Sequence, residues 1–171
     1  MKSLENIIPF VIDNDHVLSN GVYYPSMGRK YNLRDGLGIS LLVERTNIEP
    51  IIMSGERDES IYSRAKKLNI AFFPTKNKFK TLTRWYHGLK YLAISDDTPD
   101  LELLQNATVA FCPADAHDEV LRLVDRHGSG IILTRKGGDA CVREAIDYLL
   151  SNKYLQEKFN IKVVQQKEQH S

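Results

Sequence analysis

The sequence predicts an α/β fold built on a doubly wound parallel sheet with helices on both faces. Short apolar runs alternate with amphipathic segments from one end of the chain to the other. The runs are apolar almost throughout, which is typical of strands covered on both faces. A length of 171 residues suits one domain with its own core. The expected strands are 7–12, 50–53, 70–73, 91–95, 108–111 and 130–133.

The segments between these strands are predicted to be helices joined to them by right-handed crossovers. Asp58 and Asp115 stand where N-caps are expected, and Asp118, three residues after Asp115, completes a pattern similar to a capping box. In such sheets ligands bind beyond the carboxyl ends of the strands. The expected helices are 35–45, 58–67, 78–86, 99–105, 116–124 and 139–150.

One stretch after the first strand departs from this alternation. Residues 22–24 and 30–33 flank a turn at 25–29, which predicts a β-hairpin. The hairpin either overhangs the carboxyl end of the first strand or decorates an edge. We expect one domain over residues 1–153, followed by a polar C-terminal tail over 154–171.

Composition argues against several classes of partner. The formal net charge of +1 offers no strong attraction for nucleic acid or an anionic membrane. No apolar run has the length of a bilayer span, and the N-terminus lacks a basic-then-apolar signal. Cys112 and Cys141 have no metal-ligand spacing, so we expect core thiols of a reduced, cytoplasmic protein.

Five aspartates follow two of the expected strands. Asp13 and Asp15 end the first strand, while Asp96, Asp97 and Asp100 come after the fourth. Clustered carboxylates are electrostatically unfavourable unless a cation lies between them. A hard ion such as Mg²⁺, with a substrate phosphate completing its coordination shell, is the ion expected to bind there.

An Asp-x-Asp pair at a strand end suits phosphoryl transfer, because one carboxylate can attack phosphorus while the other protonates the leaving oxygen. Ser54 offers a hydroxyl and, with Gly55, exposed backbone N–H groups for the transferred group. A lysine within 76–80 can neutralise another phosphate oxygen. A lone Asp-x-Asp is a weak signal, and the order of these motifs along the chain is the strong one.

That order resembles the haloacid dehalogenase superfamily of phosphatases. The chain is most similar to its capless branch, the 3-deoxy-manno-octulosonate 8-phosphate phosphatases and their nonulosonate 9-phosphate relatives. The resemblance covers about residues 7–150 and includes two motifs peculiar to this branch, 113–116 and 137–144. The other matching segments are 13–21, 34–39, 54–56, 64–68 and 96–101.

The resemblance implies a Rossmann-like fold without a cap domain, and hydrolysis of a sugar acid phosphate through an aspartyl phosphate. Asp13 would be the nucleophile and Asp15 the acid/base. Mg²⁺ would be bound by Asp13, the main-chain carbonyl of Asp15 and Asp96, with Asp97 and Asp100 in support.

Phosphate would be bound by Ser54, Gly55 and a lysine. Lys78 matches the family lysine, although Lys76 and Lys80 can also be aligned with it through small gaps.

The chain departs from the family pattern at three positions. His16 stands where the family has glycine, Asn20 replaces an aspartate, and Ser95 replaces the glycine before the acidic pair. None of these changes removes a reacting group. We expect His16 to adopt glycine-type backbone angles at some cost and to crowd the mouth of the site. The less favoured alternative makes His16 a proton carrier.

Glu56 bears on the substrate, because the octulosonate enzymes have arginine there. Glu56 with Arg64 and Lys67 is similar to the nine-carbon branch, which acts on sialic-acid-type phosphates. Alternatively, Arg64 and Lys67 decorate a solvated helix face at i, i+3. Arg64 lies roughly 12 Å beyond Glu56 along a helix, which is too far for easy contact with the same end of the substrate. Arg64 and Lys67 would therefore reach a neighbouring subunit's site. The resemblance implies a homotetramer with shared sites.

A rival hypothesis is a non-catalytic module. A domain of this kind, fused to sialic acid cytidylyltransferases, serves oligomerisation or regulation and has generally lost the nucleophilic aspartate. Asp13 is present here, which favours the enzyme. We therefore predict a cytoplasmic Mg²⁺-dependent phosphatase with a small-molecule substrate, and neither a nucleic-acid nor a membrane partner.

Overall fold

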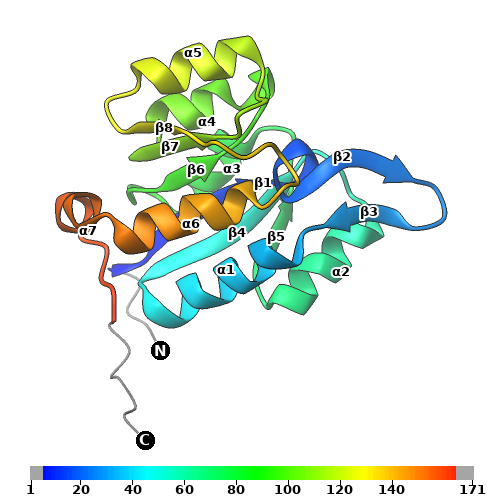
Figure 1. Ribbon diagram of the computed structural model, residues 1–171, viewed down its shortest axis with the longest axis horizontal. Coiled ribbons are helices and arrows are strands. Elements are labelled where there is room, and N and C mark those ends of the chain that lie inside the picture. The colour runs from blue at the N-terminus through cyan, green and yellow to red at the C-terminus, as the bar shows by residue number, and fades with distance from the viewer. Residues whose placement is uncertain (1–5, 165–171) are drawn as a thin grey trace, which may run out of the picture.

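The computed structural model describes residues 6–164, which form a six-stranded parallel sheet between two layers of helices (Figure 1). The strand order is β5-β4-β1-β6-β7-β8, so the first strand lies in the middle. All six predicted strands are confirmed. Their bounds are β1 (Ile8–Asp13), β4 (Ile48–Ser54), β5 (Ala71–Pro74), β6 (Leu92–Ile94), β7 (Val109–Cys112) and β8 (Gly130–Ile132).

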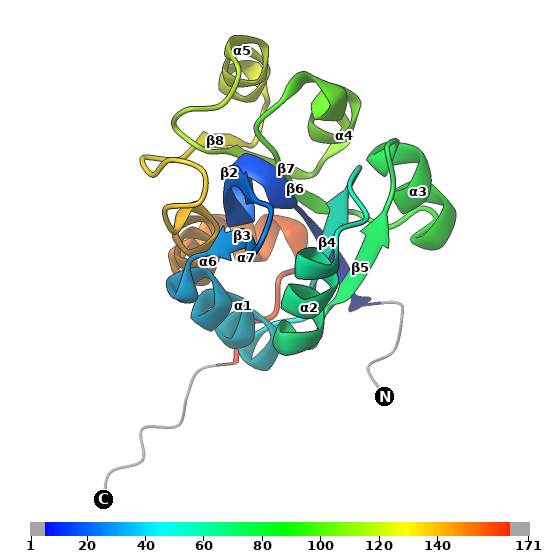
Figure 2. The same ribbon diagram turned by 90° about the vertical axis from the view of Figure 1, so that its right-hand side faces the viewer.

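Helices cover both faces of the sheet (Figure 2). Apolar side chains of α1, α2, α6 and α7 join one core cluster, and those of α3, α4 and α5 join the other. Among residues 6–164, no helix is long and apolar enough to cross a membrane. The bounds are α1 (Leu33–Arg45), α2 (Glu59–Leu68), α3 (Lys78–Trp85), α4 (Leu101–Asn106), α5 (Asp118–Arg126), α6 (Cys141–Ser151) and α7 (Lys153–Phe159).

The two cores explain why the strands are apolar throughout. Successive side chains of a strand point to opposite faces of the sheet. In β1, Phe10 and Ile12 therefore pack in one core while Val11 packs in the other, and all three are fully buried. Cys112 and Cys141 are also fully buried and free, as predicted, and burial raises the pKa of both thiols.

The predicted hairpin consists of β2 (Ser19–Tyr24) and β3 (Gly28–Tyr31), which pair in antiparallel fashion. Gly28 has a φ of +68°, and a Cβ there would lie 2.7 Å from the Cβ of Ser60 on α2. Glycine thus permits both the turn and the approach to α2. The hairpin projects beside α2 (Figure 1), and no separate cap domain is inserted within the part of the chain that the structure describes.

One of the two predicted N-caps is wrong. Asp58 is the N-cap of α2, as expected, but Asp115 does not cap α5. Asp115 lies within a turn that the Ala116 N–H closes on the Pro113 carbonyl, and α5 begins later, at Asp118, with His117 as its cap. Asp115 instead accepts a hydrogen bond of 2.9 Å from the backbone N–H of Gly137.

The polar tail expected from residue 154 is partly packed on the domain. Residues 153–159 form α7, and Leu155 and Ile161 are each 5% exposed within the core. Val163 forms an antiparallel bridge with Thr46. Isolated apolar residues in a polar segment give little periodic signal, which is why this helix was not predicted. Residues 165–171 lie outside the described part of the chain.

Two of the family motifs meet where α1 packs on α6. Asp35 on α1 is fully buried, and its Oδ1 accepts a hydrogen bond of 2.8 Å from the backbone N–H of Arg143. Its Oδ2 has no hydrogen-bond partner. Burial raises the pKa of Asp35 to about 6, which the hydrogen bond from Arg143 only partly opposes.

We predict that Asp35→Asn stabilises the protein at neutral pH. The folded-state pKa exceeds the ordinary value of 3.8, so the folded protein binds more protons than the unfolded chain between these pH values. The parent therefore loses stability as pH rises from about 4 to about 6, by at most about 3 kcal/mol. Asparagine does not titrate and can accept the same hydrogen bond.

Urea unfolding at several pH values measures this difference. Asp125→Asn, at an exposed position on α5, is the matched control and should show no comparable pH-dependent gain. A difference between Asp35→Asn and the parent that does not change with pH would contradict the prediction.

Candidate active site

The carboxyl ends of three neighbouring strands bring the predicted residues together. Asp13 ends β1, Ser54 ends β4, and Asp96 lies two residues after the end of β6. They line a cleft of about 460 Å³, which we call the acidic cleft. Its lining residues are Asp13, Asp15, His16, Ser54, Gly55, Glu56, Thr75, Lys76, Lys78, Asp96, Asp97, Pro99 and Asp100.

A buried lysine connects the two acidic segments. Lys78 is 7% exposed, and its Nζ lies 2.6 Å from Asp13 Oδ1 and 2.5 Å from Asp100 Oδ2. Ser95 Oγ is also within hydrogen-bond reach of both carboxylates, at 3.1 Å from Asp13 and 2.5 Å from Asp100. Burial would lower the pKa of Lys78, but the two carboxylates outweigh it and the pKa is raised. Burial raises the pKa of Asp13, and Lys78 partly offsets this rise.

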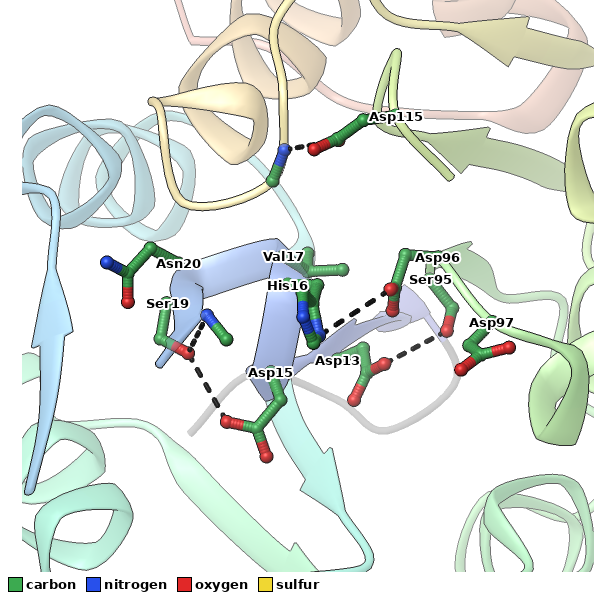
Figure 3. Close-up of polar contacts among 12 residues, drawn as sticks. Asp13, Asp15, His16, Val17, Ser19, Asn20, Ser95, Asp96, Asp97 and Asp115 are labelled. Atoms are coloured by element: carbon green, nitrogen blue, oxygen red, sulfur yellow. Dashed lines mark hydrogen bonds and ion pairs between the residues drawn. The ribbon is translucent and has the colours of Figure 1, made fainter. Parts of the chain in front are cut away.

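The chain leaves β1 through a wide turn, η2 (Asn14–Leu18), in which Asp15 and His16 have non-helical backbone angles. Asp13 accepts a hydrogen bond of 2.7 Å from the Asn14 N–H, which orients its carboxylate. His16 has a φ of +57°, so the expected glycine-type conformation is confirmed. Its ring packs over Gly21, and its Nδ1 lies 3.9 Å from Asp96 Oδ2 at the mouth of the cleft (Figure 3).

The loop before α6 braces this turn from behind. The Gly138 N–H donates to the Val17 carbonyl at 2.8 Å. A Cβ at Gly137 would lie 1.6 Å from the His16 carbonyl oxygen, so only glycine fits there. Asp115 accepts from the Gly137 N–H (Figure 3). These two motifs, 113–116 and 137–144, therefore support the turn after Asp13 instead of lining the cleft.

Asp15 is held by a residue that sequence analysis did not identify. Arg29 of β3 makes a two-point contact with the Asp15 carboxylate through Nε and Nη2. Asn14 Nδ2 and Ser19 Oγ also donate to Asp15, at 3.0 Å and 3.3 Å. The Asp15 carboxylate faces Ser19 in Figure 3, whereas that of Asp13 faces Ser95. No local pattern marks Arg29, because the contact forms only when the hairpin folds back.

The remaining acidic residues fit a hard cation. Burial raises the pKa of Asp96 to about 8, with a further contribution from the charge of Asp13. Lys78 contacts Asp13 and Asp100, and within residues 6–164 no lysine or arginine forms an ion pair with Asp96. An oxygen-seeking divalent ion between Asp13 and Asp96 would relieve this repulsion.

The third protein ligand would be a main-chain oxygen. Within residues 6–164, no three His, Cys, Asp or Glu side chains are grouped as a metal site. The residues that would hold the ion are Asp13 and Asp96 through their carboxylates and Asp15 through its main-chain carbonyl. Asp97 accepts from the Thr98 N–H at 2.7 Å and so shapes the loop that carries Asp96.

The phosphate side of the cleft contains the expected donors. Ser54 is 3% exposed, its Oγ accepts from the Glu56 N–H at 3.1 Å, and Gly55 follows in an exposed turn. Among the three alternative lysines, Lys78 touches Asp13, Lys76 lines the cleft and Lys80 does not.

Two predicted substrate residues lie elsewhere. Glu56 is exposed and lines the acidic cleft, whereas Arg64 and Lys67 line a separate hollow between the hairpin and α2. Arg64 is 7% exposed, donates to the Asn32 carbonyl at 3.2 Å, and lies 5.2 Å from the centre of the Tyr31 ring. Lys67 is exposed. Within one chain, neither residue joins Glu56.

Known proteins resemble this chain in sequence and in structure, although no family model matches it. The 3-deoxy-D-manno-octulosonate 8-phosphate phosphatase KdsC of Salmonella typhi is 28% identical over 162 residues, covering 88% of this chain and 82% of that protein. KdsC of Escherichia coli K12 is 29% identical over 159 residues, covering 85% and 80%.

Solved structures of such phosphatases are also similar to this chain. The cobalt-bound deoxy-D-mannose-octulosonate 8-phosphate phosphatase of Haemophilus influenzae has a TM-score of 0.72 at 29% identity, covering 86% of this chain and 89% of that one. The Moraxella catarrhalis phosphatase, in complex with magnesium, phosphate and KDO, has a TM-score of 0.72 at 25% identity, covering 92% and 93%. In sequence and in fold, the chain is similar to phosphatases of the haloacid dehalogenase superfamily.

Within that superfamily, its relatives are 3-deoxy-D-manno-octulosonate 8-phosphate phosphatases, which are phosphoric monoester hydrolases. The predicted family and fold are therefore confirmed. The roles of the individual residues in this chain remain predictions, which the geometry of the cleft makes specific.

We predict that Lys78→Met lowers turnover of an aryl phosphate by about a hundredfold or more, because it removes the fixed positive charge beside the reacting group. Steady-state phosphate release measures the loss, and thermal unfolding shows whether the variant is folded. Lys80→Met, two residues along α3, is the matched control and should stay close to the parent. Equal losses in the two variants would contradict the assignment of Lys78.

Proposed function

We propose that this protein is a Mg²⁺-dependent phosphatase that hydrolyses the phosphate ester of a 2-keto-3-deoxy sugar acid. The observation that carries the proposal is the contact of Asp13 with buried Lys78 beside Asp96, at the ends of neighbouring strands. The names of the relatives support this substrate class. Two buried free cysteines are in keeping with the cytoplasm, where we place the protein.

In the first step, a carboxylate oxygen of Asp13 attacks phosphorus, and the bond from phosphorus to the sugar oxygen breaks. Lys78, Ser54 and the Gly55 N–H stabilise the negative charge on the phosphoryl oxygens. Asp15 delivers its proton to the departing sugar oxygen. The product of this step is an aspartyl phosphate on Asp13 and a free sugar acid.

In the second step, water attacks the aspartyl phosphate. Asp15, now ionised, accepts the proton from that water, and the bond between Asp13 and phosphorus breaks to release inorganic phosphate. Asp13, Asp96 and the Asp15 carbonyl would hold Mg²⁺, which screens the like charges of nucleophile and phosphate when it is bound.

Asp13→Asn is expected to lower phosphate release by at least about a thousandfold, because an amide cannot form the aspartyl phosphate. The assay uses 3-deoxy-manno-octulosonate 8-phosphate, a nonulosonate 9-phosphate and p-nitrophenyl phosphate, each with Mg²⁺ and with EDTA. A variant within tenfold of the parent would contradict the nucleophile. A parent inactive on all three esters would favour the non-catalytic module.

We further propose that the substrate belongs to the nine-carbon class. Glu56 lies exposed at the cleft, where the eight-carbon enzymes are expected to have arginine. The substrate named for the relatives has eight carbons, so the same assay decides between the two. A higher kcat/KM for the eight-carbon substrate would overturn this assignment.

We also propose a homotetramer in which a neighbour completes the site. Large apolar side chains are exposed on the hairpin and on the start of α1, including Met27 at 64% and Leu33 at 75%. A neighbouring subunit that covers this face would bury them and would shelter a cleft that lacks a cap. Lys67, exposed beside the hairpin, is placed to reach a neighbour's substrate, with Arg64 at the base of the same hollow.

Native mass spectrometry should therefore show a tetramer. Inactive Asp13→Asn subunits mixed with weakened Lys67→Ala subunits should give more activity than the sum of the two separate proteins. The gain arises because some hybrid sites combine an intact nucleophile with an intact lysine. A fully active monomer would contradict the shared site.

A further inference from the structure

Arg29 is a buried cation that links three parts of the molecule. Its side chain is 8% exposed although it belongs to the two-stranded hairpin outside the main sheet. Nε and Nη2 contact the two oxygens of Asp15, and Nη1 lies 3.2 Å from Asp58 Oδ1 in an ion pair. The carboxylate of Asp15 raises the pKa of Arg29, so the guanidinium stays charged.

The two-point contact restrains Asp15 in a way that its other contacts do not. A guanidinium that bonds both oxygens of a carboxylate fixes the plane of that carboxylate as well as its position. The other donors to Asp15, Asn14 and Ser19, are one and four residues away and move with the same turn. Arg29, 14 residues away on β3, holds Asp15 from a more distant part of the chain.

Asp58, which anchors Arg29, is itself held in a fixed position. Asp58 is the N-cap of α2, accepting from the Ser60 N–H at 2.8 Å, so it belongs to the rigid start of a helix. The guanidinium also lies 5.5 Å from the centre of the Tyr23 ring on the opposite hairpin strand. Arg29 is therefore held by α2 and by its own hairpin while it holds Asp15.

We propose that Arg29 is a positioning residue for the acid/base, which aligns Asp15 with the leaving oxygen and makes proton transfer depend on a folded hairpin. This inference rests on the proposed phosphatase function. It extends that function to a residue outside the cleft lining and gives the hairpin a role in the chemistry as well as in shelter. Misalignment of a general acid by a fraction of an ångström is enough to slow proton transfer.

The competing explanation is that Arg29 merely fastens the hairpin to α2. The two explanations differ in how they depend on the leaving group. When the aspartyl phosphate forms, a sugar alkoxide needs a proton to depart, whereas p-nitrophenolate leaves readily without one, so misplacing the acid slows this step strongly only with the sugar phosphate. Damage to the fold or to phosphate binding would slow both reactions alike.

The experiment measures the single-turnover rate of leaving-group release by Arg29→Met, which reports the first step alone, on a sugar acid phosphate and on p-nitrophenyl phosphate. We expect release of the sugar acid to slow by about 10- to 100-fold. Release of p-nitrophenolate should stay within about threefold of the parent. Arg29→Lys, which keeps the charge but cannot make the two-point contact, should show a smaller loss in the same pattern.

Two controls separate positioning from fastening. Lys30→Met changes the exposed neighbour on β3 and should behave as the parent on both substrates. Asp58→Asn keeps an N-cap for α2 but removes the carboxylate that anchors Arg29 to the helix. Asp58→Asn should slow the reaction of the sugar phosphate less than Arg29→Met does, because Arg29 still contacts Asp15.

The inference would be overturned, with the proposed function intact, if Arg29→Met slowed leaving-group release equally on the two substrates. The same holds if Asp58→Asn slowed release of the sugar acid as much as Arg29→Met does. If Arg29→Met fails to fold, Arg29→Lys is judged by the same comparison of substrates. A parent that hydrolyses neither ester would overturn the proposed function and this inference together.

Discussion

The ion pairs of Lys78 with Asp13 and Asp100 make the acidic cleft possible. Several carboxylates meet at the ends of β1 and β6, and like charges in a partly buried cleft repel strongly. Lys78 offsets two of these charges from within the protein at 2.5 to 2.6 Å. Asp96 keeps a raised pKa, which marks the place where a further cation is favourable. Lys78 thus compensates Asp13 and Asp100, and the expected divalent ion would compensate Asp96 together with Asp13.

The same arrangement gives Lys78 a part in the stability of the fold as well as in the proposed chemistry. Breaking a buried ion pair leaves an uncompensated charge, which is strongly destabilising. Asp100, bonded to Lys78 and Ser95, is 4% exposed and never needs to meet substrate. It holds the lysine at the right place for Asp13. Ser95, in place of the family glycine, adds a hydroxyl between the two carboxylates rather than disturbing them.

A strained turn follows Asp13 and carries Asp15, the two proposed reacting carboxylates, and the fold supports this turn from two sides. His16 has a positive φ that a non-glycine residue adopts only at a cost. The glycine pair of the loop before α6 packs against its carbonyl and that of Val17. On the opposite side, the hairpin supplies Arg29 to Asp15. The site therefore depends on segments at both ends of the chain, which explains why motifs far from the chemistry accompany it.

The amino-acid sequence by itself determined the strand and helix order, the two acidic strand ends, and the superfamily. These depend on short-range patterns, namely apolar runs, N-cap residues such as Asp58, and motifs of a few residues. It also indicated the unusual conformation of His16, because a family glycine was missing there.

Only the tertiary structure decided which side chains meet. The central place of β1 between β4 and β6 brings Lys78 to Asp13, and the folded hairpin brings Arg29 to Asp15. Packing also turned part of the expected polar tail into α7 and drew Asp115 away from its helix cap to Gly137. These contacts join residues that no local pattern relates, since their energies come from burial and from charges that become neighbours only in the folded chain.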